Sequence, residues 1–315
     1  MKPAFSVIFF TTLAGAGQGL FLALYMGEVF RMTEGQLISQ DFMLTGLVVS
    51  FVLLLLGLTA STFHLGHPMR GWRAVSQWRT SWLSREVIAL PLFIALVFFY
   101  MAAHYTDQST ATTLSLGLVG IVLCFALFVC TAMIYACLKF LREWHSPLTL
   151  VNFILLGTMS GFTLAASLSA SMEPSLTYLY TFIAVVLTVT AFISRLGSLA
   201  RNKSLRESPK STVQTAIGVR HPKVQQRSMG FMGGSFNTRE FFHGKTEFFI
   251  KRIRTVFITM VFILPLAMMI LSLTSGSATL LIGAFCIQYV GLLAERWFFF
   301  AEVNHPQNLY YQTIG

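Results

Sequence analysis

Residues 42–64 read FMLTGLVVSFVLLLLGLTASTFH, an apolar run that contains no acidic or basic side chain before its final histidine. It is followed by the basic segment LGHPMRGWRAVSQWRTSWLSR (65–85) and by a second apolar run, EVIALPLFIALVFFYMAAH (86–104). A helix needs about 20 apolar residues to cross the hydrocarbon core of a bilayer. The stretch therefore predicts two membrane-spanning helices joined by a short basic loop.

Comparable apolar runs recur along the whole chain. Of its 315 residues, 55% are hydrophobic and only 11% are charged, whereas soluble domains carry about 25% charged residues. Lipid offers no partner to open backbone groups, so such runs cross as helices. The first run follows the start MKPAFSVIFF without a small-residue cleavage site, and we expect it to be retained. The sequence predicts an all-α bundle of eight transmembrane helices in a single domain (1–315), at approximately 5–28, 42–64, 86–104, 113–138, 147–171, 176–196, 253–274 and 277–300.

Lysine and arginine are distributed unevenly between the connections of these helices. The region 195–254 holds 13 of the 22 basic residues, and the loop after the second helix adds Arg70, Arg73, Arg79 and Arg85. The first, third, fifth and seventh connections carry little positive charge. Under the positive-inside rule, both termini and every basic loop are expected in the cytoplasm, including a long polar loop at 197–249.

Charge and cysteine content argue against two other classes of protein. The net charge of +10 reports membrane topology and carries little weight as a sign of nucleic-acid binding. The four cysteines, at positions 124, 130, 137 and 286, lie within apolar runs, and none forms a CxxC pair. Neither a disulfide framework nor a metal cluster is indicated.

Several polar residues are expected near the cytoplasmic side of the bundle. His64 ends the second helix and Glu86 begins the third, while Glu295 and Arg296 lie in the last third of the eighth, within GLLAERWFFFAE. Gln18, in the glycine-rich turn GAGQGL of the first helix, lies deeper. Ionisable residues inside membranes are costly and usually pair or face a functional cavity. We therefore expect these residues to converge on one site.

The chemistry of these side chains suits a site where a quinone exchanges electrons and protons. Reduction of a quinone takes two electrons and two protons. A histidine such as His64 titrates near neutral pH, and Glu86 at a helix start can pass protons in from water. Arg70 can hold an anionic, reduced quinone by a charge-assisted hydrogen bond, and the flat ring can pack among Trp and Phe side chains.

Each of these residues also has a purely structural interpretation. His64 can be an interfacial histidine bonded to a backbone carbonyl. Glu86 can be an N-terminal helix acid, favoured by the helix dipole and preceded by Ser84 as a cap. Glu295 and Arg296 can neutralise neighbouring charges or extend to the surface.

The tryptophans and glycines also have structural interpretations, and the class of the whole protein has alternatives. Trp72, Trp78 and Trp82 can form an interfacial aromatic belt, and the glycines around Gln18 can serve close helix packing. Two rival classes are a purely structural tether and a secondary transporter, whose substrate site would lie near the bilayer midplane between repeats.

The segment 61–86 resembles the signature of the DMSO reductase membrane-anchor (DmsC) family. The family pattern is a His-Leu-Gly-x-Pro-x-Arg segment followed by Leu-Ser-x-Glu at the start of the next helix. The matching residues here are His64, Leu65, Gly66, Pro68, Arg70, Leu83, Ser84 and Glu86. Eight spans, the glycine–glutamine turn of the first helix and the Glu/Arg pair of the last also fit this family.

The resemblance implies the membrane subunit of a three-subunit molybdenum enzyme in the bacterial inner membrane. A molybdopterin catalytic subunit and an iron–sulfur subunit would dock on it, and this chain would exchange their electrons with ubiquinone or menaquinone. His64 and Glu86 would serve the quinone and its protons. The surrounding pocket would be formed by Gly66, Arg70, Trp72, Gln18, Glu295 and Arg296.

No haem, iron–sulfur cluster, molybdenum or sulfur-substrate site is expected in this chain itself. A b-type haem needs axial ligands, usually a histidine pair at matching depth. His67, His145 and His243 share the side of His64, but none is placed in the middle of a helix. Haem therefore stays an open but disfavoured alternative.

Two features set the sequence apart from dimethyl-sulfoxide-reducing members of the family. Those enzymes hold their catalytic subunits outside the cytoplasm, on the side of the histidine motif, whereas here the motif lies on the basic, cytoplasmic side. The segments GFMGGSFNTREFFHGKTEFF (230–249) and AEVNHPQNLYYQ (301–312) resemble the branch associated with cytoplasmic sulfite-oxidising complexes. The resemblance thus favours electron flow from sulfite to quinone. A polysulfide-reductase-type anchor shares eight helices and quinone use, and differs in the motif.

The long loop is the expected docking face for the iron–sulfur subunit. It mixes aromatic side chains with Arg239, as protein interfaces often do. The alternative is a flexible basic linker attracted to anionic lipid headgroups.

Overall fold

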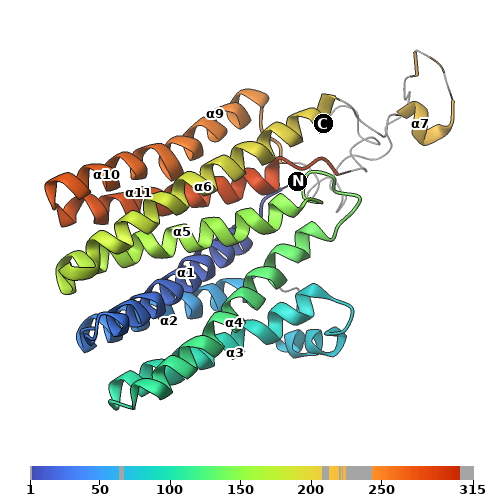
Figure 1. Ribbon diagram of the computed structural model, residues 1–315. Coiled ribbons are helices and arrows are strands. Elements are labelled where there is room, and N and C mark those ends of the chain that lie inside the picture. Colours follow the sequence, from blue (N-terminus) through green and yellow to red (C-terminus); the bar gives the residue numbers. More distant parts are fainter. Residues whose placement is uncertain are drawn as a thin grey trace.

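The computed structural model describes residues 2–63, 67–207, 213–219, 221, 223–224 and 243–305. Within these ranges, eight helices are long and apolar enough to cross a membrane, and they run alongside one another in a bundle (Figure 1). In chain order the elements are α1 (Phe5–Thr33), α2 (Gln40–Thr62), the 3-10 helix η1 (Pro68–Gln77), α3 (Trp82–Tyr105), α4 (Thr110–Ala136), α5 (Pro147–Met172), α6 (Pro174–Glu207), α7 (Val213–Ile217), α9 (Glu247–Ile258), the π-helical turn η2 (Thr259–Ile263), α10 (Leu264–Ser275) and α11 (Ala278–Ala301).

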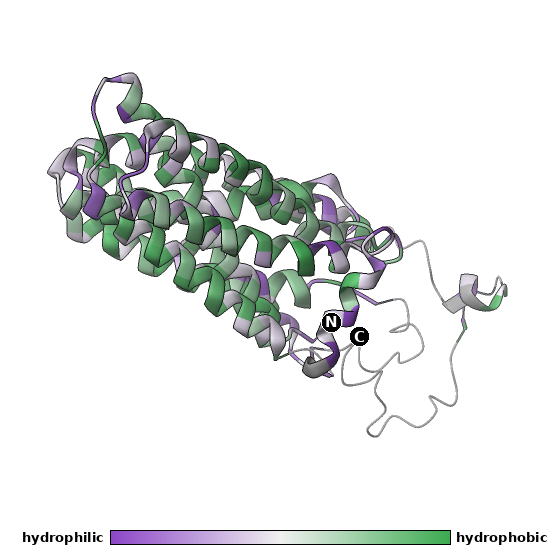
Figure 2. Cartoon of the chain, turned by 90° about the horizontal axis from the view of Figure 1, so that it is seen from below, coloured by the Kyte–Doolittle hydropathy of each residue, from purple (hydrophilic) through white to green (hydrophobic). Residues whose placement is uncertain are grey.

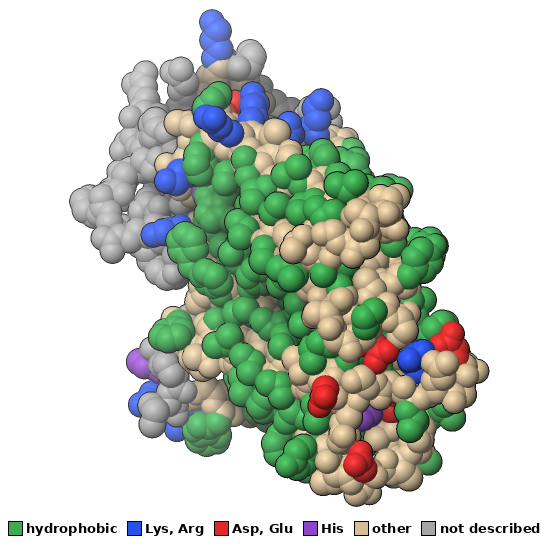
Figure 3. All heavy atoms as spheres, turned by 90° about the vertical axis from the view of Figure 1, so that its left-hand side faces the viewer, with side chains coloured by type: hydrophobic (Ala, Val, Ile, Leu, Met, Phe, Trp, Pro, Cys, Tyr) green, Lys and Arg blue, Asp and Glu red, His purple; other side chains and the backbone are tan. Residues whose placement is uncertain are grey.

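Hydropathy along the bundle fits a membrane span. Apolar residues occupy the middle of the helices, and hydrophilic residues concentrate towards the helix ends and the connections (Figure 2). The prediction of an all-α bundle with eight spans is therefore confirmed. We call the end formed by the connections 63–81 and 137–146 the basic end, and the end formed by the connections 34–39 and 106–109 the acidic end. Figure 3, which faces the acidic end, shows acidic side chains gathered on one side of a largely apolar surface.

Helices α1 and α5 form the centre of the bundle. In their most apolar windows 83% of α1 and 72% of α5 is buried, against at most 44% of any other span. The two helices touch through glycines: a Cβ atom added to Gly19 would lie 2.3 Å from the carbonyl oxygen of Gly157, and one added to Gly161 would lie 2.0 Å from the carbonyl carbon of Gly19. Small residues allow such close backbone approach in membrane bundles. The packing role expected for the glycines around Gln18 is thus borne out in the structure.

The sixth span is longer than the sequence predicts. Helix α6 continues to Glu207, eleven residues beyond the expected end at 196, and α9 starts at Glu247, so the expected loop 197–249 is shorter at both ends. Arg201 explains the extension: its guanidinium donates to the carbonyl oxygens of Arg142 at 3.0 Å and His145 at 2.9 Å. These bonds tie the last turns of α6 to the connection between α4 and α5.

The seventh span contains one turn of π-helix, which is explained by a proline. Pro265 has no N–H to give to the carbonyl of Val261, four residues earlier, and its ring disfavours the α-helical register there. The chain widens to π-helix over Thr259–Ile263, and the side-chain amide of Gln288 on α11 donates to the freed Val261 oxygen at 3.3 Å. Neighbouring helices commonly satisfy the backbone that a proline leaves open in a membrane span.

Gln288→Leu is expected to destabilise the bundle by about 1–3 kcal/mol, because it removes a side-chain donor from the buried Val261 carbonyl, to which Pro265 cannot donate. The measurement is the thermal unfolding midpoint of the purified protein in detergent. Pro265→Ala restores a backbone N–H at this position, so the same leucine substitution should cost less in that background. Equal losses in the two backgrounds would contradict this account of the π-helical turn.

Candidate functional site

Glu86 lies in the second turn of α3 and is bonded to a neighbouring helix. Helix α3 begins at Trp82, and the side chain of Ser81 accepts a hydrogen bond from the backbone N–H of Ser84 at 3.4 Å, so the expectation that Ser84 is the cap is wrong. Glu86 is only 6% exposed, and its Oε1 accepts a hydrogen bond from the hydroxyl of Thr131 on α4. An acid stabilised only by the helix dipole would lie in the first turn. Glu86 lies beyond that turn and is an internal polar group.

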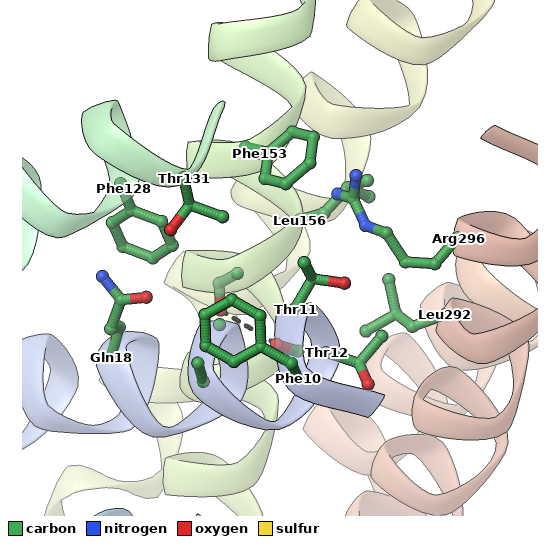
Figure 4. A pocket seen from close by; sticks show the side chains of 14 residues that line it. Phe10, Thr11, Thr12, Gln18, Phe128, Thr131, Phe153, Leu156, Leu292 and Arg296 are labelled. Carbon is green, nitrogen blue, oxygen red and sulfur yellow. Dashed lines mark hydrogen bonds between the residues drawn. The ribbon is translucent and has the colours of Figure 1, made fainter. Parts of the chain in front are cut away.

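A cavity, here called the inner cavity, lies beside this pair. It offers about 20 Å³ to the centre of a water molecule, within an empty volume of about 410 Å³ that includes open solvent. It lies between α1, α4, α5 and α11 (Figure 4). Its lining residues are Phe10, Thr11, Thr12, Ala14, Gly15, Gln18, Phe128, Thr131, Phe153, Leu156, Gly157, Ser160, Leu292 and Arg296. Because Thr131 belongs both to this lining and to the bond with Glu86, the carboxylate lies one hydroxyl away from the cavity.

Gln18 and Arg296 supply the other strongly polar groups of the inner cavity. They reach it from α1 and α11, with the aromatic ring of Phe153 above (Figure 4). The amide of Gln18 donates to the backbone carbonyl of Cys124 at 2.9 Å. The guanidinium carbon of Arg296 lies 3.9 Å from the centre of the Phe153 ring, and the residue is buried. The cavity thus combines aromatic walls with hydrogen-bond donors.

A second cavity, here called the outer cavity, lies next to the inner one towards the basic end. Its lining residues are Glu143, Ser146, Thr149, Asn152, Phe153, Arg195, Ser198, Arg201, Asn202, Glu295, Arg296 and Phe299. Phe153 and Arg296 therefore line both cavities. Glu295 lines the outer cavity, and it is not among the residues that line the inner one.

Glu295 is part of a buried charge cluster. Its Oε1 lies 2.8 Å from Nε of Arg195, and its Oε2 lies 3.4 Å from Nε of Arg296. Nη2 of Arg195 also lies 3.9 Å from Oε2 of Glu302. Charges in a membrane bundle persist when they are paired in this way. The interpretation that Glu295 and Arg296 neutralise neighbouring charges is therefore correct. Arg296 has a second position as well, since it also lines the inner cavity.

The loop that carries the histidine motif is attached to α3. Arg85 donates to the backbone carbonyls of Trp78 at 2.9 Å and Arg79 at 2.8 Å. Arg70 is exposed and Trp72 is 71% exposed, and neither lines a described cavity. His64 and Gly66 lie outside the described residues, as does the proposed docking segment around Arg239. The site roles of His64, Gly66, Arg70 and Trp72 stay predictions.

The structure brings together part of the predicted site and adds two residues that sequence reasoning missed. Gln18 and Arg296 line the inner cavity, and Thr131 links Glu86 to it. In the sequence, nothing distinguishes Thr131 from the rest of its apolar run. Arg195 was counted only among the basic residues that set the orientation, next to the predicted helix end at 196, but α6 continues past it and buries it against Glu295. The presence of Glu295 within the last apolar run indicates in the sequence that a basic partner lies close to it in the fold.

The histidines considered as haem ligands do not line either cavity. His67 is exposed, and Nδ1 of His145 lies 2.6 Å from the backbone oxygen of Ala136. Over the part of the chain that the structure describes, no three His, Cys, Asp or Glu side chains are arranged to hold a metal ion.

Comparison with known proteins gives the relationship of the chain. Residues 1–301 match the family described as "DMSO reductase anchor subunit (DmsC)". The chain is 52% identical to the C subunit of the sulfite dehydrogenase of Allochromatium vinosum over 327 aligned positions, which span all of both proteins. It is 24% identical over 191 positions to the C component of the anaerobic dimethyl sulfoxide reductase of Haemophilus influenzae, an alignment that spans 60% of this chain and 67% of that protein. The chain therefore belongs to the DMSO reductase anchor subunit (DmsC) family.

Proposed function

We propose that this chain is the quinone-reactive membrane anchor of a three-subunit molybdoenzyme that passes electrons from cytoplasmic sulfite to membrane quinone. The observation that carries the proposal is the inner cavity, where the Glu86–Thr131 pair and Arg296 border an aromatic-walled space within the bundle. Small-molecule sites typically combine apolar and aromatic walls with a few placed polar groups.

The inner cavity has the groups that a quinone ring requires. Phe10, Phe128 and Phe153 offer flat apolar surfaces, and the guanidinium of Arg296 offers donors for a carbonyl oxygen. When bound, a quinone supplies the two-electron acceptor. Glu86 would hold the proton that neutralises the developing negative charge. The hydroxyl of Thr131 would relay it, taking a proton from the carboxyl group of Glu86 and giving its own proton into the cavity.

The four residues of the motif loop complete the proposal by family resemblance. His64 would deliver or accept the proton at the mouth of the site, and Gly66 would allow close approach of the backbone. Arg70 and Trp72 would reach the quinone or its entrance only after the loop closes over it, since both side chains are exposed. The partner subunits provide a reason for such a rearrangement, because they would cover the same end of the bundle.

The charge distribution at the ends of the bundle supports a cytoplasmic substrate side. The basic end would face the cytoplasm under the positive-inside rule, and the iron–sulfur subunit would dock there on the loop between α6 and α9. The relative from Allochromatium vinosum is named for sulfite dehydrogenase. The molybdopterin subunit would convert sulfite and water to sulfate, two protons and two electrons, and this chain would combine two electrons and two protons with one quinone.

Purification from native membranes in mild detergent tests the proposal. We expect a molybdopterin subunit, an iron–sulfur subunit and bound quinone to co-purify, and the complex to reduce added quinone when given sulfite. The measurement is identification of the polypeptides and extracted lipids, followed by the absorbance of the quinone. A complex that oxidises sulfite with a soluble artificial acceptor but never reduces quinone would leave this chain a structural tether. A chain isolated without either partner would turn attention to transport.

A further inference from the structure

The inner and outer cavities follow one another along α5. Ser146 and Asn152 line the outer cavity, Leu156 and Ser160 line the inner cavity, and Phe153 lines both. With a rise of about 1.5 Å per residue, the distance along the helix from Ser146 to Ser160 is about 21 Å. Ser146 is the N-cap of α5 at the basic end. The two cavities together therefore extend from that end of the bundle to its interior.

The outer cavity is lined by polar groups that are incompletely paired. The amide nitrogen of Asn152 donates to the hydroxyl of Ser198 on α6 at 2.7 Å. The side-chain oxygen of Asn152 is buried, and no donor among the described residues reaches it. Buried polar atoms of this kind are usually satisfied by ordered water, provided that several polar groups share the space and that there is room for the molecule. The outer cavity offers about 10 Å³ to the centre of a water molecule, which is enough for about one. Glu295 and Arg195 supply such groups in the same cavity.

Arg296 lies at the junction of the two cavities. Glu295 holds its Nε at 3.4 Å and the Phe153 ring holds its guanidinium carbon at 3.9 Å. A guanidinium keeps its proton in proteins, so Arg296 offers donors that can orient water or an electron-rich oxygen, and it does not itself give up a proton. Glu295, which is paired with two arginines, acts as a positioning residue for Arg296.

We propose that the outer cavity holds a bound water and, together with the polar side chains that line it, forms a route that brings protons from the basic end to the Arg296 side of the inner cavity. It is separate from the Glu86–Thr131 pair, which reaches the same cavity from α3 and α4. Thr131 and Arg296 come from different helices on two sides of the cavity (Figure 4). Each route would deliver one of the two protons, one to each carbonyl oxygen of the ring, while two electrons arrive from the iron–sulfur subunit.

The proposal rests on the proposed quinone reduction, and the test separates the two. Asn152→Leu keeps the side-chain size and every charge of the cluster, but replaces the polar lining by an apolar surface. We expect the assembled complex to retain its bound quinone, to form quinol at least about 10-fold more slowly, as loss of a proton-transfer path commonly causes, and to show a larger solvent deuterium isotope effect. Ser198→Val serves as the second variant if the first does not assemble.

Thr158→Val is the matched control, because Thr158 is a buried hydroxyl on the same helix that lines neither cavity. It should leave the rate and the isotope effect unchanged. A cryo-electron microscopy map of the wild-type complex at a resolution that shows water should contain ordered water at the Asn152 oxygen. A dry outer cavity, or wild-type rates in the assembled Asn152→Leu complex, would overturn the route. A wild-type complex that cannot reduce quinone would overturn the proposed function itself.

Discussion

Replacing Glu86 by glutamine is expected to remove most quinone-linked turnover while the complex still assembles. Glutamine has the same size, and its carbonyl can accept the hydrogen bond from Thr131 that the carboxylate accepts in the structure. It cannot bind and release a proton, however, and a positioned acid or base contributes about 10²–10⁴-fold to a rate. The measurement is sulfite-driven quinol formation in membranes, compared with sulfite oxidation by a soluble acceptor that bypasses this chain.

The matched control for this experiment is Glu28→Gln. Glu28 is a carboxylate as buried as Glu86, with 6% exposure, but it lies towards the acidic end, where it accepts hydrogen bonds from Tyr100 and, at 2.5 Å, from Thr113. Its replacement should leave quinol formation near that of the wild type. His64→Ala is expected to act like Glu86→Gln if the histidine also serves the protons. Undiminished quinol formation in Glu86→Gln would reduce the protein to a tether.

Gly161→Ala is expected to prevent correct assembly of the bundle. A Cβ atom there would lie 2.0 Å from the carbonyl carbon of Gly19 and 2.1 Å from the nitrogen of Leu20. Both neighbours are backbone atoms of α1, so no side-chain rotation relieves the overlap and the two central helices must separate. Overpacking of a well-packed core costs about 1–3 kcal/mol or more. We expect a loss of folded protein from the membrane, measured by immunoblot and by the thermal midpoint of whatever is purified.

Gly197→Ala is the corresponding control. Gly197 lies in α6, and a Cβ atom added to it would meet nothing within 4 Å. Alanine should be neutral or stabilising there, because it favours helix over glycine by about 1 kcal/mol. If both alanine variants accumulate to wild-type levels, the close contact between α1 and α5 does not govern assembly.

The sequence was sufficient for the spans and for the depth of several polar residues. Every helix that crosses a bilayer must be long and apolar, so the transmembrane helices can be found without the helical periodicity of their hydrophobic residues. For the same reason Glu86 and Arg296 stood out: a charged residue inside an apolar run has few explanations. The placement of Gln18 near them followed from helix depth alone.

The parts that could not be predicted depend on which helix faces which. Thr131 and Ser198 are ordinary in apolar or helical sequence, and their importance arises from the side chains they meet, Glu86 and Asn152. The end of α6 was missed because its last turns are polar, and Arg201 bonds from these turns to another loop. The separation of Glu295 from the inner cavity likewise depends on helix rotation, which hydropathy does not report.

The contact between α1 and α5 has a consequence for biosynthesis. Gly19 and Gly161 are 142 positions apart in the sequence, and ribosomes add about 5–20 residues per second. The first helix therefore waits about 7–28 seconds in the membrane before its main partner has been made. For the first part of that interval the amide of Gln18 also lacks its acceptor, the carbonyl of Cys124, which is made 106 positions after Gln18. Helix α2 is made next and can already cover one side, since the hydroxyl of Ser50 donates to the carbonyl of Gly17. The insertion machinery would have to retain or shield the other side until the fifth helix arrives.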